Sequence, residues 1–298
     1  MKQILKYIRI ILSYIYGLLL CVVYSLLPKR RLVSREQGPR VIVSLTSYGR
    51  RVSSTLKYPV YSMLLQSRRP DRIVVWLDNV CFSEDFLPAS VKRLEKYGVE
   101  IRFCEDLKSY KKLVPALKAY PDDIIITIDD DIIYERNTLK CLLDKHNDYP
   151  DDIICTMAHI PTFGADGLKP YNDWKLNVCY SEEELIFPLG GSGTLYPPHS
   201  LYKDVTDASL FMKLAPQADD IWFWVMALKN GSRIRMSGLN RMYRQIDLMY
   251  QQTHRNASLK DSNLGENRND TQIKAVFDYY GLNLDKSSVL AMISARQG

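Results

Sequence analysis

Several familiar chemical signatures are missing from this sequence. The six cysteines form no Cys-x-x-Cys pair and most lie inside apolar runs, so we expect small core residues in a reducing compartment. No Gly-x-x-x-x-Gly-Lys-Ser/Thr segment is present, which argues against a P-loop phosphotransfer enzyme. No zinc-finger or RRM-like signature appears, so nucleic acid is not an expected partner. With only four histidines, the chain offers few nitrogen ligands for a metal.

The positive charge of the chain is unevenly distributed. The 298 residues have a formal net charge of +6 and a hydrophobic content of 46%, enough for one large domain or two small ones. A local basic collar near the N-terminus suits anionic lipid headgroups better than duplex nucleic acid. Its members are Lys29, Arg30, Arg31, Arg35, Arg40, Arg50 and Arg51.

An uncharged run, residues 10–27, precedes this collar. As a helix it would be ~27 Å long, close to the thickness of a bilayer core. No small-residue cleavage site follows, which argues against a removed signal peptide. A single membrane span and an in-plane helix held by its basic flanks are both possible, and we expect the span. More Lys and Arg follow the run than precede it, so the positive-inside rule predicts a single-pass anchor (residues 1–35) with the rest on the cytoplasmic side of the inner membrane.

Strand and helix patterns alternate after the anchor. Strands are predicted at 41–45, 72–77, 99–103 and 124–128, separated by predicted helices at 52–65, 88–97 and 110–119. This spacing is typical of βαβ units, so the predicted fold class is α/β with a mostly parallel sheet flanked by helices. Residues 36–255 form the predicted domain, with a possible strand at 153–157 and a helix opening at 218. A polar loop and a last helix are predicted within 256–298.

Three consecutive aspartates follow the predicted strand at 124–128. They are Asp129, Asp130 and Asp131, and in open α/β sheets ligands bind at this end of the strands. Adjacent carboxylates repel one another unless a cation compensates them, and oxygen ligands suit Mg²⁺ or Mn²⁺. A solvated acidic turn is the simpler alternative, because Asp is common in turns. The strand in front favours a metal site that grips nucleotide phosphates.

The ordered set of motifs resembles the GT-A fold glycosyltransferases, in particular the bacterial family-2-like enzymes that build surface polysaccharides. The resemblance covers roughly residues 40–254. It rests on the opening segment 41–51, on Asp78 at a strand end, on the Asp-x-Asp-like triplet, on Gly190-Gly191-Ser192-Gly193 and on Asp219-Asp220-Ile221-Trp222. It implies a Rossmann-like nucleotide-diphospho-sugar transferase fold. The pair Lys111-Lys112 departs from the Ala/Arg/Asn-rich stretch of many relatives.

The resemblance also implies roles for individual residues. The nucleotide-sugar donor would contact Thr46, Tyr48, Arg50, Asp78, Asp129 and Asp130. A divalent cation would be held by Asp129, Asp131 and His254, and the acceptor by Gly191, Ser192, Gly193 and Trp222. Lys112 could add positive charge near the phosphates, although a solvated helix face is the more ordinary expectation for this lysine pair. Trp222 could also be a core residue.

Asp219 and Asp220 open the helix predicted from 218. Acids at a helix N-terminus are favoured by its dipole, so Asp219 could be only a cap. A second acid exceeds what capping needs, and a carboxylate there could act as general base toward an acceptor hydroxyl. We expect Asp220 to be the base and Asp219 an acceptor contact, although the order could be reversed.

Three functions follow from these patterns. The leading one is a membrane-anchored, metal-assisted glycosyltransferase that moves a sugar from a nucleotide-sugar donor to a glycan or lipid-linked acceptor in surface polysaccharide synthesis. A nucleotidyltransferase or other phosphotransfer enzyme is the alternative, because it too uses acids at a strand end. A non-catalytic membrane scaffold is the third, and the retained acids argue against it.

Overall fold

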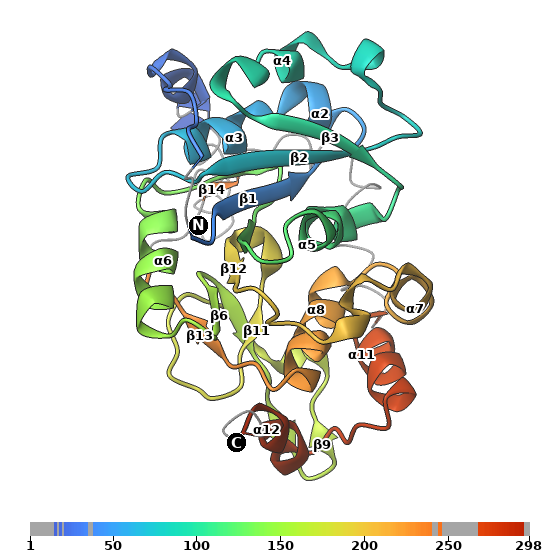
Figure 1. Cartoon of the computed structure of the whole chain (residues 1–298). Helices are drawn as coiled ribbons and strands as arrows, with labels where there is room; N and C mark the ends of the chain where they lie inside the picture. Colours follow the sequence, from blue (N-terminus) through green and yellow to red (C-terminus); the bar gives the residue numbers. More distant parts are fainter. Residues whose placement is uncertain are drawn as a thin grey trace, which may run out of the picture.

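A seven-stranded sheet organises the chain (Figure 1). The computed structural model describes residues 15–16, 18–19, 21–34, 38–239, 244–245 and 268–294. The strand order is β13-β6-β12-β4-β1-β2-β3. The strands are β1 (Val41–Thr46), β2 (Arg72–Asp78), β3 (Glu100–Cys104), β4 (Ile124–Thr127), β6 (Ile153–Cys155), β12 (Thr194–Tyr196) and β13 (Ile234–Met236).

The sheet is mostly parallel, as the sequence predicts. β1 lies between β2 and β4 and is parallel to both, with Ser44 opposite Val74 and Thr127. β3 extends this parallel half beyond β2, and β13 is parallel to β6. Only β12 runs antiparallel in this sheet, between β4 and β6. The predicted fold class is confirmed for the α/β sheet.

Helices cover both faces of the sheet (Figure 1). α2 (Arg51–Ser54), α3 (Lys57–Leu64) and α4 (Ala89–Lys92) lie on one face, and α5 (Val114–Ala119) on the other. Strand residues alternate between the two cores: Val75 packs with the first group, whereas Val74 and Trp76 face α5. The remaining helices are α6 (Thr138–Asp148), α7 (Ala208–Leu214), α8 (Asp219–Lys229), α11 (Arg268–Tyr279) and α12 (Lys286–Ser294).

Each of the three early helices predicted from sequence is interrupted. The stretch predicted at 52–65 divides into α2 and α3 at Thr55 and Leu56, just before Pro59. A proline removes a backbone donor and its ring clashes with the carbonyl four residues earlier, which here belongs to Thr55. The stretch predicted at 110–119 likewise contains a 3₁₀ helix (Lys108–Lys112) followed by α5.

Short strands build the second half. They are β5 (Ile132–Ile133), β7 (Ala158–Ile160), β8 (Phe163–Gly164), β9 (Gly167–Leu168), β10 (Lys175–Val178), β11 (Phe187–Pro188) and β14 (Arg244–Gln245). β7 pairs antiparallel with β10 and β11, and β5 with β14.

The predicted membrane anchor lies partly outside the described residues. Within the ranges that the structure covers, no helix is long and apolar enough to span a bilayer. The described end of the N-terminal helix has exposed apolar side chains, and the segment after it is tied to the domain: Leu32 donates its N–H to the Tyr97 carbonyl at 2.8 Å, and Arg69 donates to the carbonyls of Arg30 and Arg31.

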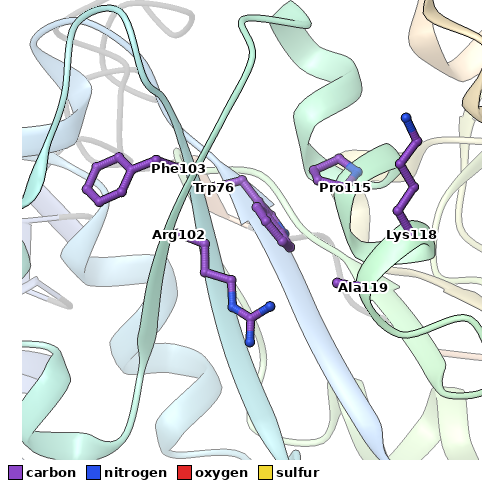
Figure 2. Close-up of a pocket in the computed structure, with 6 residues that line it drawn as sticks. All are labelled: Trp76, Arg102, Phe103, Pro115, Lys118 and Ala119. Atoms are coloured by element: carbon purple, nitrogen blue, oxygen red, sulfur yellow. The ribbon is translucent and has the colours of Figure 1, made fainter.

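A shallow, open pocket lies beside the edge strand β3 and α5 (Figure 2). It is lined by Trp76, Arg102, Phe103, Pro115, Lys118 and Ala119, none of which is a predicted site residue.

Candidate functional site

The three aspartates lie at the carboxyl end of β4, beside the end of β1. Asp130 is buried and accepts a hydrogen bond from the Ser47 hydroxyl. Arg51, the first residue of α2, donates one Nη1 to Asp130 at 2.9 Å and to Asp131 at 3.1 Å. A guanidinium therefore compensates two of the three carboxylates.

The charges in this first group are desolvated. Burial raises the pKa of Asp130, although Arg51 and the Ser47 hydroxyl act in the opposite direction. For Arg51, burial alone would lower the pKa, but the two neighbouring carboxylates raise it above its usual range. Arg51 is therefore positively charged, and it is the cation that compensates the buried carboxylate of Asp130. A donor contact was predicted for Arg50 and not for Arg51, although Arg51 is the last residue of the opening segment 41–51.

A second group of charges surrounds Lys112. Its Nζ lies 3.0 Å from Asp219 Oδ2, 3.3 Å from Asp129 Oδ1 and 3.8 Å from Asp220 Oδ1. The Lys112 side chain is only 7% exposed, and its carbonyl accepts a hydrogen bond from Ser44 at 2.6 Å. Burial alone would lower the pKa of this lysine, but the three carboxylates raise it well above its usual value. The expectation of a solvated helix face was wrong, because the 3₁₀ turn directs the side chain inward.

Asp220 is partly exposed to solvent and has a raised pKa. Its side chain is 27% exposed, and its Oδ1 accepts the Gly190 N–H at 3.1 Å. Loss of surrounding water raises its pKa to about 7, with Asp219 and Asp129 adding to the rise and Lys112 opposing it. A carboxylate with a pKa near neutrality and an exposed face can accept a proton from a bound hydroxyl. Asp219 is not the cap of α8, because that position belongs to Ala218.

The glycine segment 190–193 lies close to the carboxylates of Asp129 and Asp220. A Cβ on Gly191 would lie 1.8 Å from Asp129 Oδ2, and one on Gly190 would lie 2.7 Å from Asp220 Oδ1. Gly193 has a φ of +104°, which side chains rarely adopt. The chain's own carboxylates thus occupy the space beside Gly190 and Gly191. An acceptor contact by Gly191, Ser192 or Gly193 stays a prediction.

The predicted donor contacts lie around the ends of β1 and β2. Thr46 donates its hydroxyl to the Trp76 carbonyl at 2.8 Å, and Arg50 is exposed before α2. Tyr48 is 44% exposed, with the Arg51 guanidinium 5.3 Å from its ring centroid. Asp78 is buried and accepts the Cys81 N–H at 2.7 Å. Their roles toward a nucleotide stay predictions.

Trp222 does not reach the site. Its side chain is fully buried, its Nε1 donates to the Val205 carbonyl at 3.1 Å, and its ring packs edge-on against Phe211. Because α8 packs against α11 and α12, with Phe211 of α7 beside Trp222, the aromatic residues after Asp220 are covered. The predicted acceptor contact at Trp222 is therefore wrong in this structure, and Trp222 is a core residue.

The metal ligands are brought together only in part. Among the described residues, no group of three or more His, Cys, Asp or Glu side chains is arranged to hold a metal. His254, the predicted third ligand, lies outside those residues. The donor chemistry still fits a hard cation, since Asp129 and Asp131 offer oxygen atoms only and the Asp129 side chain is 42% exposed.

Comparison with known proteins gives structural likenesses only. No protein-family model and no curated protein matches the chain. Residues 1–349 of TarS from S. aureus are 15% identical, with a TM-score of 0.45 over 68% of this chain and 59% of that one. The mannosyltransferase PcManGT from Pyrobaculum calidifontis, in complex with GDP-Man and Mn²⁺, is 15% identical, with a TM-score of 0.44 over 95% of this chain and 87% of that one. CMP:2-keto-3-deoxy-manno-octonic acid synthetase, in complex with CTP, is 11% identical, with a TM-score of 0.40 over 66% of this chain and 88% of that one.

A mannosyltransferase is among the solved structures that the chain resembles. The matched region spans 59% of the TarS structure. Because the sequence identities are 15% or less and the TM-scores lie below 0.5, these likenesses do not indicate a substrate.

Proposed function

We propose that this protein is a glycosyltransferase that moves a sugar from a nucleotide-sugar donor to a hydroxyl of a glycan or lipid-linked acceptor. The observation that carries the proposal is the buried ammonium of Lys112, which joins Asp129 at the end of β4 to Asp219 and Asp220 at the start of α8. This arrangement places a donor-side acid and a titratable acid around one fixed positive charge.

The chemistry assigned to Asp220 is general base catalysis. Its carboxylate takes the proton of the acceptor hydroxyl, the acceptor oxygen forms a bond to the anomeric carbon of the sugar, and the bond from that carbon to the diphosphate breaks. The diphosphate leaves with the electron pair. The Lys112 charge favours the ionised form of Asp220, and the Gly190 N–H orients one of its oxygens. Asp219, 8% exposed, holds Lys112 from the helix side and is the candidate acceptor contact.

A divalent cation, Mn²⁺ or Mg²⁺, is the proposed partner of Asp129 and Asp131. When bound, it would supply positive charge to the departing diphosphate as a Lewis acid. Arg51 keeps Asp131 in place at 3.1 Å, and Asp129 presents its partly exposed carboxylate beside Lys112.

Membrane association is a second part of the proposal. The uncharged run 10–27 supports it, as do the exposed side chains of Leu18, Leu19, Val22, Val23 and Leu26 in the described part of that run. We infer a single-pass anchor with the domain on the cytoplasmic side. The full-length protein should stay in the membrane fraction after washes in high salt and leave it only in detergent. Release by salt alone would contradict the span.

A thermal-shift screen followed by a turnover assay tests the activity. Full-length protein in detergent is mixed with UDP, GDP or CDP, each with and without Mn²⁺, and then with the corresponding nucleotide sugars. Metal-dependent stabilisation by one nucleoside diphosphate, and slow release of that diphosphate from its sugar conjugate, would support the proposal. Release of pyrophosphate from a nucleoside triphosphate and a sugar phosphate would instead identify a nucleotidyltransferase. No response to any nucleotide would favour the scaffold.

A further inference from the structure

Tyr134 is a buried residue that connects the aspartate triplet to the glycine segment 190–193. It follows β5, five residues after Asp129, and its side chain is fully buried. Its hydroxyl accepts a hydrogen bond from the Asp129 backbone N–H at 2.8 Å and donates one to the Gly191 carbonyl. A single phenol oxygen therefore joins the aspartate triplet to the glycine segment, which is more than fifty residues away in sequence.

The two joined segments approach each other closely. The Asp129 N–H also lies 3.2 Å from the Gly191 carbonyl, and a side chain at Gly191 would overlap the Asp129 carboxylate. Thr127, in β4, donates its hydroxyl to the Gly190 carbonyl at 2.7 Å. The relative position of the segments is thus set by side-chain hydroxyls as well as by the backbone.

The glycine segment in turn holds the proposed base. The Gly190 N–H donates to Asp220 Oδ1 at 3.1 Å, so a shift of the 190–192 turn relative to β4 changes the distance from Asp129 to Asp220. Tyr134 is itself held by α3, because its backbone N–H donates to the Ser62 hydroxyl at 3.2 Å. A connected path therefore runs from the scaffold through Tyr134 to both acids.

We propose that Tyr134 is a positioning residue, whose hydroxyl fixes the separation between the donor-side carboxylate of Asp129 and the base-side carboxylate of Asp220. This inference rests on the proposed glycosyl transfer. The phenol oxygen binds the backbone N–H of Asp129 and the backbone carbonyl of Gly191, so Tyr134 acts through the two backbones. Because a misplacement of about 1 Å at a reacting centre can cost ~10²-fold in rate, a loosened connection should reduce turnover more than binding.

The test is Tyr134→Phe, which keeps the ring and removes the hydroxyl. We expect kcat to fall about 10- to 100-fold, while the donor KM changes less than about threefold. The matched control is Tyr120→Phe, which removes the hydroxyl of another buried tyrosine; that hydroxyl forms a partly buried hydrogen bond of 3.1 Å with Glu100. A similar fall in melting temperature for both variants, with a loss of kcat only for Tyr134→Phe, is the expected result.

A second variant keeps the test decisive if Tyr134→Phe is poorly folded. Thr127→Val removes the neighbouring hydrogen bond to Gly190 and should lower kcat in the same direction. Wild-type kcat in a folded Tyr134→Phe, or in Thr127→Val when the first variant does not fold, would overturn the positioning role. Equal loss of kcat in Tyr120→Phe would do so as well. If the wild-type protein itself transfers no sugar, the proposed function fails and the role of Tyr134 fails with it.

Discussion

Two groups of carboxylates make up the site, and each is compensated by a different kind of cation. At the end of β4, Arg51 binds Asp130 and Asp131 at 2.9 and 3.1 Å. At the start of α8, Lys112 lies 3.0 Å from Asp219 but 3.8 Å from Asp220. A guanidinium has several donors in a fixed plane, whereas an ammonium is a compact point charge that several acids can share.

The two groups differ in role: the acids around Arg51 are structural, whereas the group around Lys112 contains an acid that titrates. The Arg51 group is buried, and its acids are held by direct hydrogen bonds from a guanidinium and a hydroxyl. In the Lys112 group, Asp220 keeps an exposed face, and the surrounding protein raises its pKa to about 7. We infer that the first group shapes the donor side of the site and that the second performs the proton transfer.

The largest expected effect is that of Asp220→Asn on turnover. Asparagine keeps the size of the side chain and its bond from Gly190 but cannot take a proton, so transfer should fall ~10²- to 10⁴-fold while donor binding survives. Asp219→Asn is the matched comparison and should raise the acceptor KM more than it lowers kcat. Steady-state rates and donor affinities for both variants check this. Near-normal transfer by Asp220→Asn would move the assignment of the base to Asp219.

Arg51→Met should instead affect stability. It leaves Asp130 buried without its cation, a change that costs about 3 kcal/mol or more. Burial raises the folded-state pKa of Asp130 above its unfolded value, so the stability linked to its proton is complete at low pH and is lost as the pH rises through the folded pKa. Loss of Arg51 raises that pKa further, and the cost should therefore be larger at pH 7 than at pH 4.

Urea unfolding at both pH values measures this effect. Arg50→Met, at the exposed neighbouring position, is the control and should change stability by less than about 0.5 kcal/mol. A cost for Arg51→Met that is equal at the two pH values would argue against a buried charge as its cause.

The parallel half of the fold and its acids were predictable from sequence. Continuous apolar runs predicted β1, β2 and β4, because strands buried on both faces leave little room for polar residues, whereas β3 at the edge is only partly buried. The same runs fixed where Asp129 and Asp78 would lie, since side chains that follow parallel strands meet at one edge. The antiparallel β12 was not predicted, because its three residues follow a glycine turn and carry no periodic pattern.

The partners of the acids could not be predicted. Whether Lys112 faces solvent or the interior depends on a 3₁₀ turn that lasts only five residues, Lys108–Lys112. The Trp222 ring packs against Phe211 of α7 and against Tyr280, which lies far from it in the chain, and a sequence pattern does not specify such a distant contact. Arg51 could have been suspected, because three adjacent acids need compensation and it ends the segment singled out beside them.

Lys112→Met tests whether the shared ammonium sets the pH dependence. Wild-type kcat should rise with pH through about 7 as Asp220 loses its proton. The Lys112 charge lowers the pKa of Asp220, so its removal should move this rise to higher pH and reduce the rate at pH 7 about tenfold or more. Lys112→Arg, which keeps the charge, should leave the rise near its wild-type position. Lys118→Met, on the exposed face of α5, is the control, and an unchanged profile in Lys112→Met would contradict the role.

The smallest expected effect on stability is that of Asp129→Asn, and it sharpens the contrast between the two groups. The Asp129 side chain is 42% exposed and lies 3.3 Å from Lys112, which Asp219 also holds. Because solvent screens an exposed pair and Lys112 keeps its other partners, the free energy of unfolding should change by less than about 0.5 kcal/mol. Binding of a Mn²⁺–nucleoside diphosphate should nevertheless weaken, since the variant loses one proposed metal ligand. Calorimetric titration with and without Mn²⁺, beside urea unfolding, separates the two quantities. A large loss of stability would place Asp129 with the structural charges of Arg51, and unchanged metal-dependent binding would remove it from the metal site.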